Sequence, residues 1–265
     1  MKLLSIVVVN YRGFDLTLQM YKSLISSLDS SEFDFVVVDN SQSEDENKNL
    51  NSVFEGCSNV LISPVVNKGY FQGLNDGLDL INVDDYKYVV VGNNDIIFAP
   101  DFSEKLKFAN YADDVYAICP DVRSSEGVHQ NPHVVKRFNF LQRLKIDIYF
   151  SNYYVASALL IIKNAFSSKV RADKDEEPRI IHMGIGAIYI LTASFFKCNR
   201  RLAFPFFLYG EEAFLSNQIH NSGGVLFYDP DLMVDHLESA TLSKTPSRDR
   251  YNWARDGYKV YREYL

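Results

Sequence analysis

The 265-residue sequence predicts an α/β fold in which helices cover both faces of a mostly parallel central sheet. In the first half, short apolar runs alternate with segments whose apolar residues recur at helical spacing, which is typical of strand–helix–strand units. Four runs rich in β-branched or aromatic residues predict buried strands. They are Leu4–Val9, Phe35–Val38, Val60–Ile62 and Tyr88–Val91.

Three helices are expected between these strands. Asp15 stands at the start of the first, and its side chain is of the type that caps helix N-termini. The apolar stripe of that helix comprises Leu16, Met20, Leu24 and Leu28. A short exposed helix is expected over the polar residues 42–51. The apolar face of the third helix comprises Leu74, Leu78 and Ile81.

The second half of the chain is less regular. Strands are expected at Val115–Ile118, Ile188–Leu191 and Val225–Tyr228, and a helix at Ala213–Ile219. The charged residues 171–179 indicate a loop. The sequence contains no internal repeat that would indicate a solenoid or propeller.

A final amphipathic helix is expected over 247–265. Its apolar face comprises Tyr251, Ala254, Tyr258, Tyr261 and Leu265. We therefore predict a domain over residues 1–240, with halves at 1–100 and 101–240, followed by a C-terminal helical extension over 241–265.

Composition excludes several classes of protein. A formal net charge of −7 is unsuited to coating nucleic acid, which calls for a basic face. The three cysteines, Cys57, Cys119 and Cys198, have no metal-site or disulfide spacing and suit a reducing cytosol. No stretch approaches the roughly 20 apolar residues of a membrane span, and the N-terminal apolar run predicts a strand rather than a signal peptide. We therefore expect a cytoplasmic protein.

Polar side chains stand at the predicted ends of three strands. Asn10, Asp39 and Asp95 occupy these positions, and ligands of such sheets bind beyond the carboxyl ends of the strands. Asp95, preceded by Asn93 and Asn94, could hold a divalent metal over a diphosphate, although the same residues also suit an ordinary turn. Asp39 could accept a hydrogen bond from a nucleobase or ribose, or else serve as a helix cap.

Three further segments contain candidate residues. Asn67, Lys68 and Gly69 precede the third helix, which contains Asn75, and could line a diphosphate or form a tight turn. They match neither a dinucleotide-binding nor a Walker pattern, so neither a nicotinamide cofactor nor ATP hydrolysis follows.

Glu211 and Glu212 begin an apolar helix, where acids complement the helix dipole or act as a general base. His236 follows a predicted strand and could ligate a metal or simply pack.

The order of these pieces resembles family 2 glycosyltransferases of the GT-A fold, especially the rhamnosyltransferase-like branch that builds bacterial surface polysaccharides. Seven segments over about residues 3–240 carry the resemblance. They are Ser5-Ile6-Val7-Val8-Val9-Asn10-Tyr11, Val37-Val38-Asp39-Asn40-Ser41, Asn67-Lys68-Gly69-Tyr70 with Asn75, Gly92-Asn93-Asn94-Asp95, Gly186-Ala187, Phe207-Leu208-Tyr209-Gly210-Glu211-Glu212 and His236.

The resemblance implies a role for each matching residue. Residues 1–100 would bind the nucleotide sugar and 101–240 the acceptor. The donor would meet Asn10, Asp39, Asn67, Lys68, Gly69, Asn75, Asn93 and Asn94. Asp95 and His236 would hold Mg²⁺ or Mn²⁺, although Asn93 replaces one carboxylate of the usual DxD motif. Glu212 would be the catalytic base of an inverting transfer, with Glu211 beside it.

The expected partners follow from this resemblance. They are a nucleoside-diphosphate sugar, such as dTDP-rhamnose or a UDP-hexose, and a glycan or lipid-linked saccharide acceptor. The other functions considered are a sugar-nucleotide nucleotidyltransferase and a non-catalytic sugar-nucleotide-binding subunit. Basic and aromatic residues in 136–145 and in the final helix, Lys244 among them, suit the inner face of the cytoplasmic membrane. Packing on the catalytic domain or on a second subunit of a homodimer is the alternative.

Overall fold

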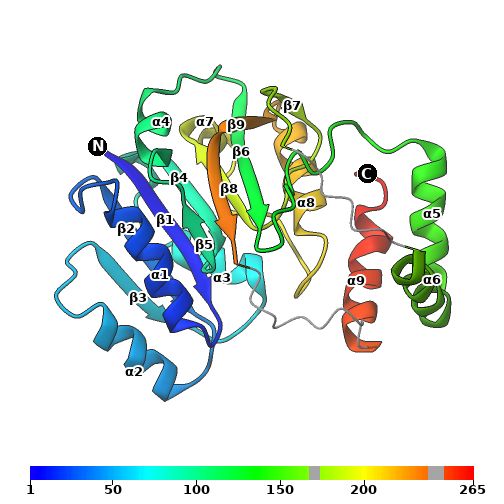
Figure 1. The fold of residues 1–265 in the computed structure, drawn as a ribbon, viewed down its shortest axis with the longest axis horizontal. Coiled ribbons are helices and arrows are strands. Elements are labelled where there is room, and N and C mark those ends of the chain that lie inside the picture. Colours follow the sequence, from blue (N-terminus) through cyan, green and yellow to red (C-terminus); the bar gives the residue numbers. More distant parts are fainter. Residues whose placement is uncertain (167–173, 238–247) are drawn as a thin grey trace.

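The computed structural model describes residues 1–166, 174–237 and 248–265 (Figure 1). Within these residues nine strands form one sheet in the order β3-β2-β1-β4-β8-β6-β9-β5, with β7 paired to β9. The strands are β1 (Lys2–Asn10), β2 (Phe33–Asp39), β3 (Val60–Pro64), β4 (Tyr86–Asn93), β5 (Ile96–Phe98), β6 (Val115–Ser124), β7 (Arg179–Ile181), β8 (Ile188–Thr192) and β9 (Val225–His236).

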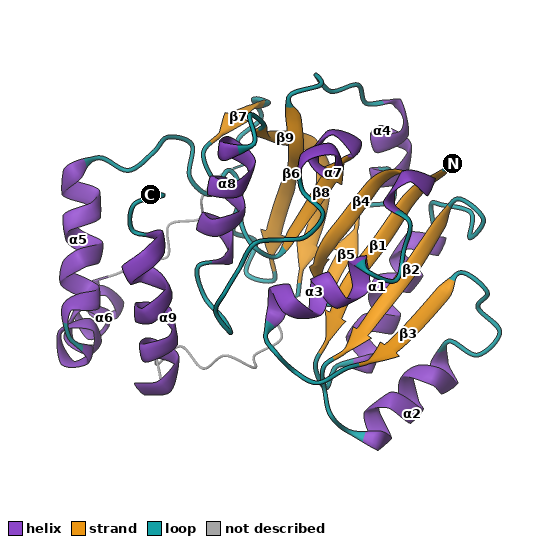
Figure 2. Cartoon of the chain, turned by 180° about the vertical axis from the view of Figure 1, so that it is seen from behind, coloured by secondary structure: helices purple, strands orange, loops and turns teal. Residues whose placement is uncertain are grey.

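Helices cover both faces of this sheet, as the sequence predicts (Figure 2). They are α1 (Phe14–Ile25), α2 (Glu44–Val53), α3 (Tyr70–Leu78), α4 (Phe102–Phe108), α5 (Phe140–Ser151), α6 (Tyr153–Phe166), α7 (Ala193–Cys198), α8 (Glu211–Asn221) and α9 (Arg248–Tyr261), with a 3₁₀ turn at Val83–Asp85. One core layer contains apolar residues of α1, α2 and α4, and the other contains those of α3, α7 and α8.

The sheet is parallel over its first four strands and mixed beyond them. β1 pairs in parallel with β2 and β4, and β2 pairs in parallel with β3. β8 then runs antiparallel to both β4 and β6, while β6 and β9 are parallel. The prediction of a mostly parallel sheet therefore holds for the first half only. The strand–helix alternation that favours parallel pairing is lost in the second half.

The start of α1 differs from the expectation. Gly13 is the N-cap residue, and Asp15 lies in the first turn, so the prediction that Asp15 caps the helix is wrong. A distant residue supplies the missing acceptor, because the Phe14 N–H donates to Glu46 Oε1 at 2.8 Å. Sequence neighbours could not reveal this contact, since 32 positions separate the two residues.

Helix α3 lies unusually close to the sheet. A Cβ added at Gly77 would stand 2.4 Å from Val7 Cγ1 and 2.8 Å from Val38 Cγ2. Only glycine avoids both contacts, because side chains in a packed core cannot overlap. This close packing on β1 and β2 places the N-terminus of α3 at the carboxyl edge of both strands, where Asn40 Nδ2 donates to the Gly69 carbonyl at 3.4 Å.

Helices α5, α6 and α9 lie together at the end of the molecule away from the parallel strands (Figures 1 and 2). The Tyr258 ring of α9 stacks on Phe150 of α5 with centroids 4.5 Å apart, and its hydroxyl donates to Asp147 Oδ1 at 2.6 Å. Arg262 forms a bidentate pair with the same carboxylate. The tyrosine stripe of the final helix is thus packed against the protein. Residues 241–247, with Lys244, lie outside the described part.

We expect Tyr258→Ala to lower the free energy of unfolding by about 3 kcal/mol, because Tyr258 is 4% exposed and its removal leaves a cavity between α5 and α9. Urea denaturation measures the change. Val260→Ala is the matched control on the same helix, since Val260 is 43% exposed and its truncation should stay within about 0.5 kcal/mol. Equal effects of the two substitutions would contradict the packing of α9.

Candidate active site

The buried side chain of Asn10 joins the ends of β1 and β2. Its Nδ2 donates to Asp39 Oδ1 at 3.2 Å, to Ser41 Oγ at 3.3 Å and to Glu46 Oε1 at 3.0 Å. Asn10 is fully buried, and its contact with the donor stays a prediction. It orients Asp39, and the Ser41 N–H holds the same Asp39 oxygen at 3.0 Å.

The other side of the Asn10 amide connects to β4. Its Oδ1 accepts from Thr17 Oγ1 at 3.1 Å and from Asn94 Nδ2 at 3.0 Å. Asn94 Nδ2 also donates to the Gly13 carbonyl and to Thr17 Oγ1. Asn94 therefore turns its amide nitrogen inward and anchors the loop after β4. Its direct contact with a donor stays a prediction.

A cavity of about 630 Å³ opens beside Asp39. Its wall includes Asn47, Lys48 and Pro64. The Asn47 Nδ2 atom is buried and has no hydrogen-bond partner among the described residues. An unpartnered buried donor is costly, so Asn47 is a polar group in this wall whose pairing the described residues do not supply.

Asp95 and His236 meet at the carboxyl edge of the sheet although 141 positions separate them. The antiparallel pairing of β5 with β9 sets Ile96 opposite His236. As a result His236 Nε2 lies 3.3 Å from Asp95 Oδ1, and Asn93 Nδ2 lies 3.3 Å from the same nitrogen. The strand predicted at Val225–Tyr228 extends to His236 itself. The structure thus brings together three of the residues predicted to serve donor and metal.

The contact of the second ring nitrogen of His236 with Gln130 assigns the tautomer of the imidazole. Nδ1 lies 3.1 Å from Gln130 Oε1, an oxygen that only accepts hydrogen bonds. With the proton on Nδ1, the Nε2 lone pair faces the Asp95 carboxylate. Two electron-rich groups this close favour a cation between them, and an imidazole held by an outer hydrogen bond is the usual metal-ligating form.

The described residues contain no group of three or more His, Cys, Asp or Glu side chains that could hold a metal ion. Asp95 and His236 therefore offer two protein ligands of the oxygen and nitrogen types. This donor set fits an ion that shares its remaining positions with water and phosphate oxygens, as Mg²⁺ usually does.

The turn before α3 lies against the loop before α8. Gly69 is the N-cap of α3 with φ of 110°, and an added Cβ would stand 2.3 Å from the Phe207 carbonyl oxygen. The Gly69 N–H donates to Asn67 Oδ1 at 3.1 Å, and Lys68 is exposed. Gly69 and Asn67 therefore shape this turn, and their contact with a donor stays a prediction.

Asn75 faces the loop at Leu202. Its side chain is 2% exposed, and both of its amide atoms pair with the Leu202 backbone at 2.9 and 2.8 Å. In this structure Asn75 therefore joins α3 to that loop, and its contact with the donor stays a prediction.

Glu212 is held beside the sheet through Gly186. The Gly186 N–H donates to Glu212 Oε1 at 3.3 Å, and the Tyr70 hydroxyl donates to the Gly186 carbonyl at 3.2 Å. A Cβ at Gly186 would stand 2.7 Å from Glu212 Oε1, so a side chain there would displace the Glu212 carboxylate. Desolvation, with the nearby carboxylates of Glu211, Asp95 and Glu212, raises the pKa of the Tyr70 phenol. Tyr70 thus links α3 to the Gly186 turn that holds Glu212.

Glu211 is the buried partner of this pair. It is 7% exposed, and its Oε1 accepts from the Tyr209 N–H at 3.0 Å. Burial, with the Glu212 carboxylate as the second cause, raises the pKa of Glu211 to about 8. Glu211 is therefore the protonated member at neutral pH. Glu212, which is half-buried, is left as the available proton acceptor.

The C-terminal helix supports the turn that carries these acids. Gly210 has φ of 101°, and an added Cβ would stand 2.4 Å from Tyr261 Cε1 of α9. A Cβ at Gly257 would likewise stand 2.9 Å from the Tyr209 carbonyl oxygen. The helix therefore packs directly on the start of α8 and helps to place Glu211 and Glu212.

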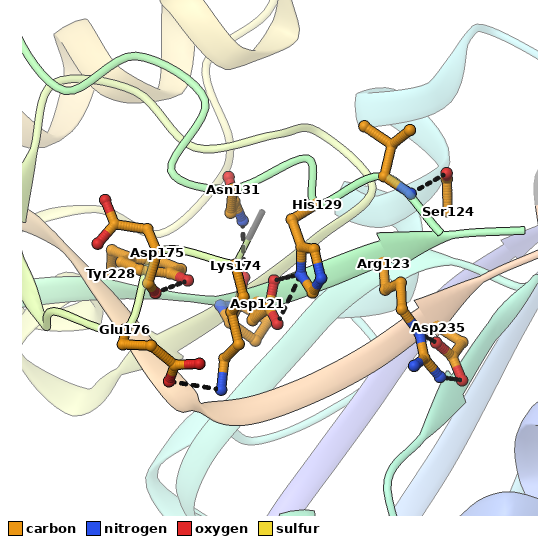
Figure 3. A network of polar contacts seen from close by, with 12 residues as sticks. Asp121, Arg123, Ser124, His129, Asn131, Lys174, Asp175, Glu176, Tyr228 and Asp235 are labelled. Carbon is orange, nitrogen blue, oxygen red and sulfur yellow. Dashed lines mark hydrogen bonds and ion pairs between the residues drawn. The ribbon is translucent and has the colours of Figure 1, made fainter. Parts of the chain in front are cut away.

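A polar network on β6 and β9 borders the site and was not predicted (Figure 3). Arg123 forms a bidentate pair with Asp235, at 2.6 and 2.9 Å. The fully buried Asp121 carboxylate lies 2.8 Å from His129 Nδ1. Burial raises the pKa of Asp121, and His129 opposes that shift. These contacts depend on the register of β6 with β9, for which the sequence holds no local signal.

Comparisons with known proteins agree with this geometry. A family model described as glycosyl transferase family 2 matches residues 5–167. A search of curated proteins finds no match. Among solved structures, the fold is similar to a crystal structure of GalNAc-T7 with UDP, GalNAc and Mn²⁺, with a TM-score of 0.63 and 14% sequence identity. The similarity covers 98% of this chain and 48% of that one, so the chain spans about half its length.

We expect Glu211→Gln to remove a pH-dependent loss of stability. The Glu211 carboxyl has a pKa of about 8 when folded, against about 4.5 ordinarily, so the folded state holds the extra proton between these values. Stability should therefore fall as pH rises from 4.5 through 8, by on the order of 4 kcal/mol, in the wild type alone.

Urea unfolding at several pH values, with Glu212→Gln as the control that removes the second cause of the shift, measures this effect. Parallel pH profiles for the wild type and Glu211→Gln would contradict the buried, protonated state of Glu211.

Proposed function

The chain belongs to glycosyl transferase family 2, and we propose that it is an inverting, metal-dependent enzyme that transfers a sugar from a nucleoside diphosphate to a hydroxyl. The observation that carries the proposal is the pair of contacts at the carboxyl edge of the sheet: His236 lies 3.3 Å from Asp95, and the Gly186 N–H holds Glu212 at 3.3 Å. A metal-binding acid on one side and a proton acceptor on the other are what a displacement at a sugar carbon requires.

The donor base would bind in the cavity beside Asp39. A uracil or thymine ring offers an imide N–H flanked by carbonyl oxygens. Asp39 would accept from the N–H, and the cavity wall at Lys48 and Pro64 would enclose the ring. We therefore propose a UDP-hexose or dTDP-rhamnose donor. The neighbour GalNAc-T7 was crystallised with UDP, which supports the uridine alternative.

Asp95 and His236 would hold Mg²⁺ or Mn²⁺ against the diphosphate, with Gln130 fixing the imidazole. When bound, such an ion offsets the negative charge that grows on the departing diphosphate. The Mn²⁺ of the neighbour GalNAc-T7 supports this assignment. Asn93, whose amide nitrogen lies 3.3 Å from His236 Nε2, would give up this contact when the ion takes the Nε2 lone pair and would then be available to the donor.

Glu212 would accept the proton of the acceptor hydroxyl. The acceptor oxygen then forms a bond to the anomeric carbon, while the bond from that carbon to the diphosphate oxygen breaks and its electron pair leaves with the nucleotide. One displacement inverts the carbon. The protonated Glu211, held by Tyr209, keeps a second negative charge away from the attacking oxygen.

The acceptor would be a glycan or a lipid-linked saccharide of a bacterial surface polysaccharide, and the enzyme would work in the cytoplasm. The acidic net charge and the absence of a cysteine framework support this setting. No helix in the described ranges is long and apolar enough to cross a membrane.

Glu212→Gln should lower the rate of transfer by about 10²- to 10⁴-fold and leave donor affinity unchanged, because the amide keeps the size but cannot accept the proton. Single-turnover kinetics with a nucleotide sugar, or its slow hydrolysis, measures the rate. Glu104→Gln is the matched control, since that acid is exposed on α4. Near-normal turnover of Glu212→Gln would place the base elsewhere, with Glu211 and Asp235 next.

Asp95→Ala should weaken metal-dependent donor binding by more than about 100-fold, since the loss of even an outer partner of a metal ligand costs about 10- to 100-fold. Calorimetry with and without Mn²⁺ gives both affinities, and Gln130→Ala should show the smaller loss. The assignment fails if Asp95→Ala binds the donor with unchanged affinity and unchanged metal dependence.

The wild type should bind UDP or dTDP more tightly than GDP or CMP. Asp39→Ala should cost about 1.5–3 kcal/mol of UDP affinity, the usual value of a hydrogen bond to a charged group. Competition against a fluorescent nucleotide checks both statements, and Lys48→Ala tests the cavity wall without removing the acceptor. Preferred binding of GDP or CMP would reject the pairing with Asp39.

A further inference from the structure

Helices α5 and α6 present an apolar surface that nothing in the described chain covers. Nine of the twenty exposed large hydrophobic side chains among the described residues lie on these two helices. Both helices stand at the end of the molecule furthest from β3 (Figures 1 and 2). We call the outer sides of Phe140–Ser151 and of 153–162 the α5–α6 face.

The outer side of α5 is apolar while its inner side is used by α9. Phe140 is 72% exposed and Leu141 66%, and Leu144 and Ile148 continue the same stripe at helical spacing. None of the twelve described residues of this helix is fully buried. Lys145 is also exposed and lies beside the stripe, where its long stem can lie along apolar groups while the ammonium reaches outward.

The outer side of α6 is apolar without interruption. Ala156 is buried against the protein, whereas Tyr154 and Ile161 are 69% and 70% exposed. Residues 153–162 contain no charged side chain. Exposed apolar patches of this kind on soluble domains mark sites of contact with a protein or a membrane.

The charge of the residues around the face distinguishes between a protein and a membrane as its partner. Residues 136–147 contain four Lys or Arg and one Asp, in a chain whose net charge is −7. Lys136 and Lys145 are exposed, whereas Arg137 donates to the Leu265 and Glu263 carbonyls. The acid, Asp147, is already paired with Arg262 and Tyr258 of the protein. The exposed lysines therefore make the α5 side of the face positive, which an anionic surface complements. A second copy of the same face would bring like charges together, which opposes association.

We propose that the α5–α6 face docks on a bilayer of anionic phospholipids, with α5 and α6 lying in the interface. The fourteen residues of α6 span about 21 Å, which is shorter than the roughly 30 Å of a hydrocarbon core, so the helix lies on the bilayer rather than across it. Apolar residues with an aromatic side chain and flanking lysines are the composition of interfacial helices. Docking at the bilayer would also bring a lipid-linked acceptor to Glu212, and this consequence rests on the proposed function.

Flotation of the full chain with vesicles tests the proposal. The wild type should float with phosphatidylglycerol-containing vesicles at low salt and much less with pure phosphatidylcholine. Leu141→Asp with Ile161→Asp should reduce flotation by at least about tenfold, because both side chains would enter the interface. Phe108→Asp is the matched control, since Phe108 is 78% exposed on α4 and should leave flotation unchanged.

Thermal unfolding of each variant confirms that the exposed substitutions leave the fold intact. The proposal is overturned if the wild type stays at the bottom with anionic vesicles, or if the double variant floats like the wild type. It is also overturned if sedimentation velocity finds a wild-type dimer that the double variant converts to a monomer. Hydrolysis of a nucleotide sugar without vesicles is measured in parallel, so failure of the proposed chemistry is seen separately.

Discussion

One buried amide, the side chain of Asn10, holds the functional edge of the sheet together. It bonds at once to Asp39 at the end of β2, to Glu46 of α2 and to Asn94 after β4. Buried amide atoms must be paired, since an unsatisfied one costs about 1–3 kcal/mol, so this residue holds two strand ends and the start of α2 at one place. That constraint fixes Asp39 beside its cavity and, through Asn94, the turn that carries Asp95.

Strand register supplies the second half of the site. The pairing of β5 with β9 brings His236 to Asp95, and the loop before β8 brings Gly186 to Glu212. Glycines permit both approaches and the tight turns around them, because Gly69, Gly186 and Gly210 would each clash if they carried a side chain. The acids then differ by environment: burial keeps Glu211 protonated, while Glu212 remains accessible to a hydroxyl.

The three helices beyond the sheet serve both the site and the surface. α9 packs its tyrosines inward on α5 and places Tyr261 against Gly210, so it supports the turn that carries the acids. Once α9 occupies the inner side of α5, the outer sides of α5 and α6 are left apolar and exposed. The same packing that stabilises the active site therefore creates the face proposed to meet lipid.

Local patterns in the sequence determined the α/β class, the parallel strands β1 to β4 and the strand-end position of Asp95, because burial of β-branched runs and turn chemistry act between near neighbours. The sequence also predicted that Glu212 lies at the start of a helix. Tertiary structure alone decided that Asn10 and Asn75 are buried, that Glu46 rather than Asp15 satisfies the start of α1, and that Gln130 holds His236. Each of those contacts joins residues at least 32 positions apart or depends on strand register. The spacing of neighbouring residues in the sequence predicts neither the long-range contacts nor the register.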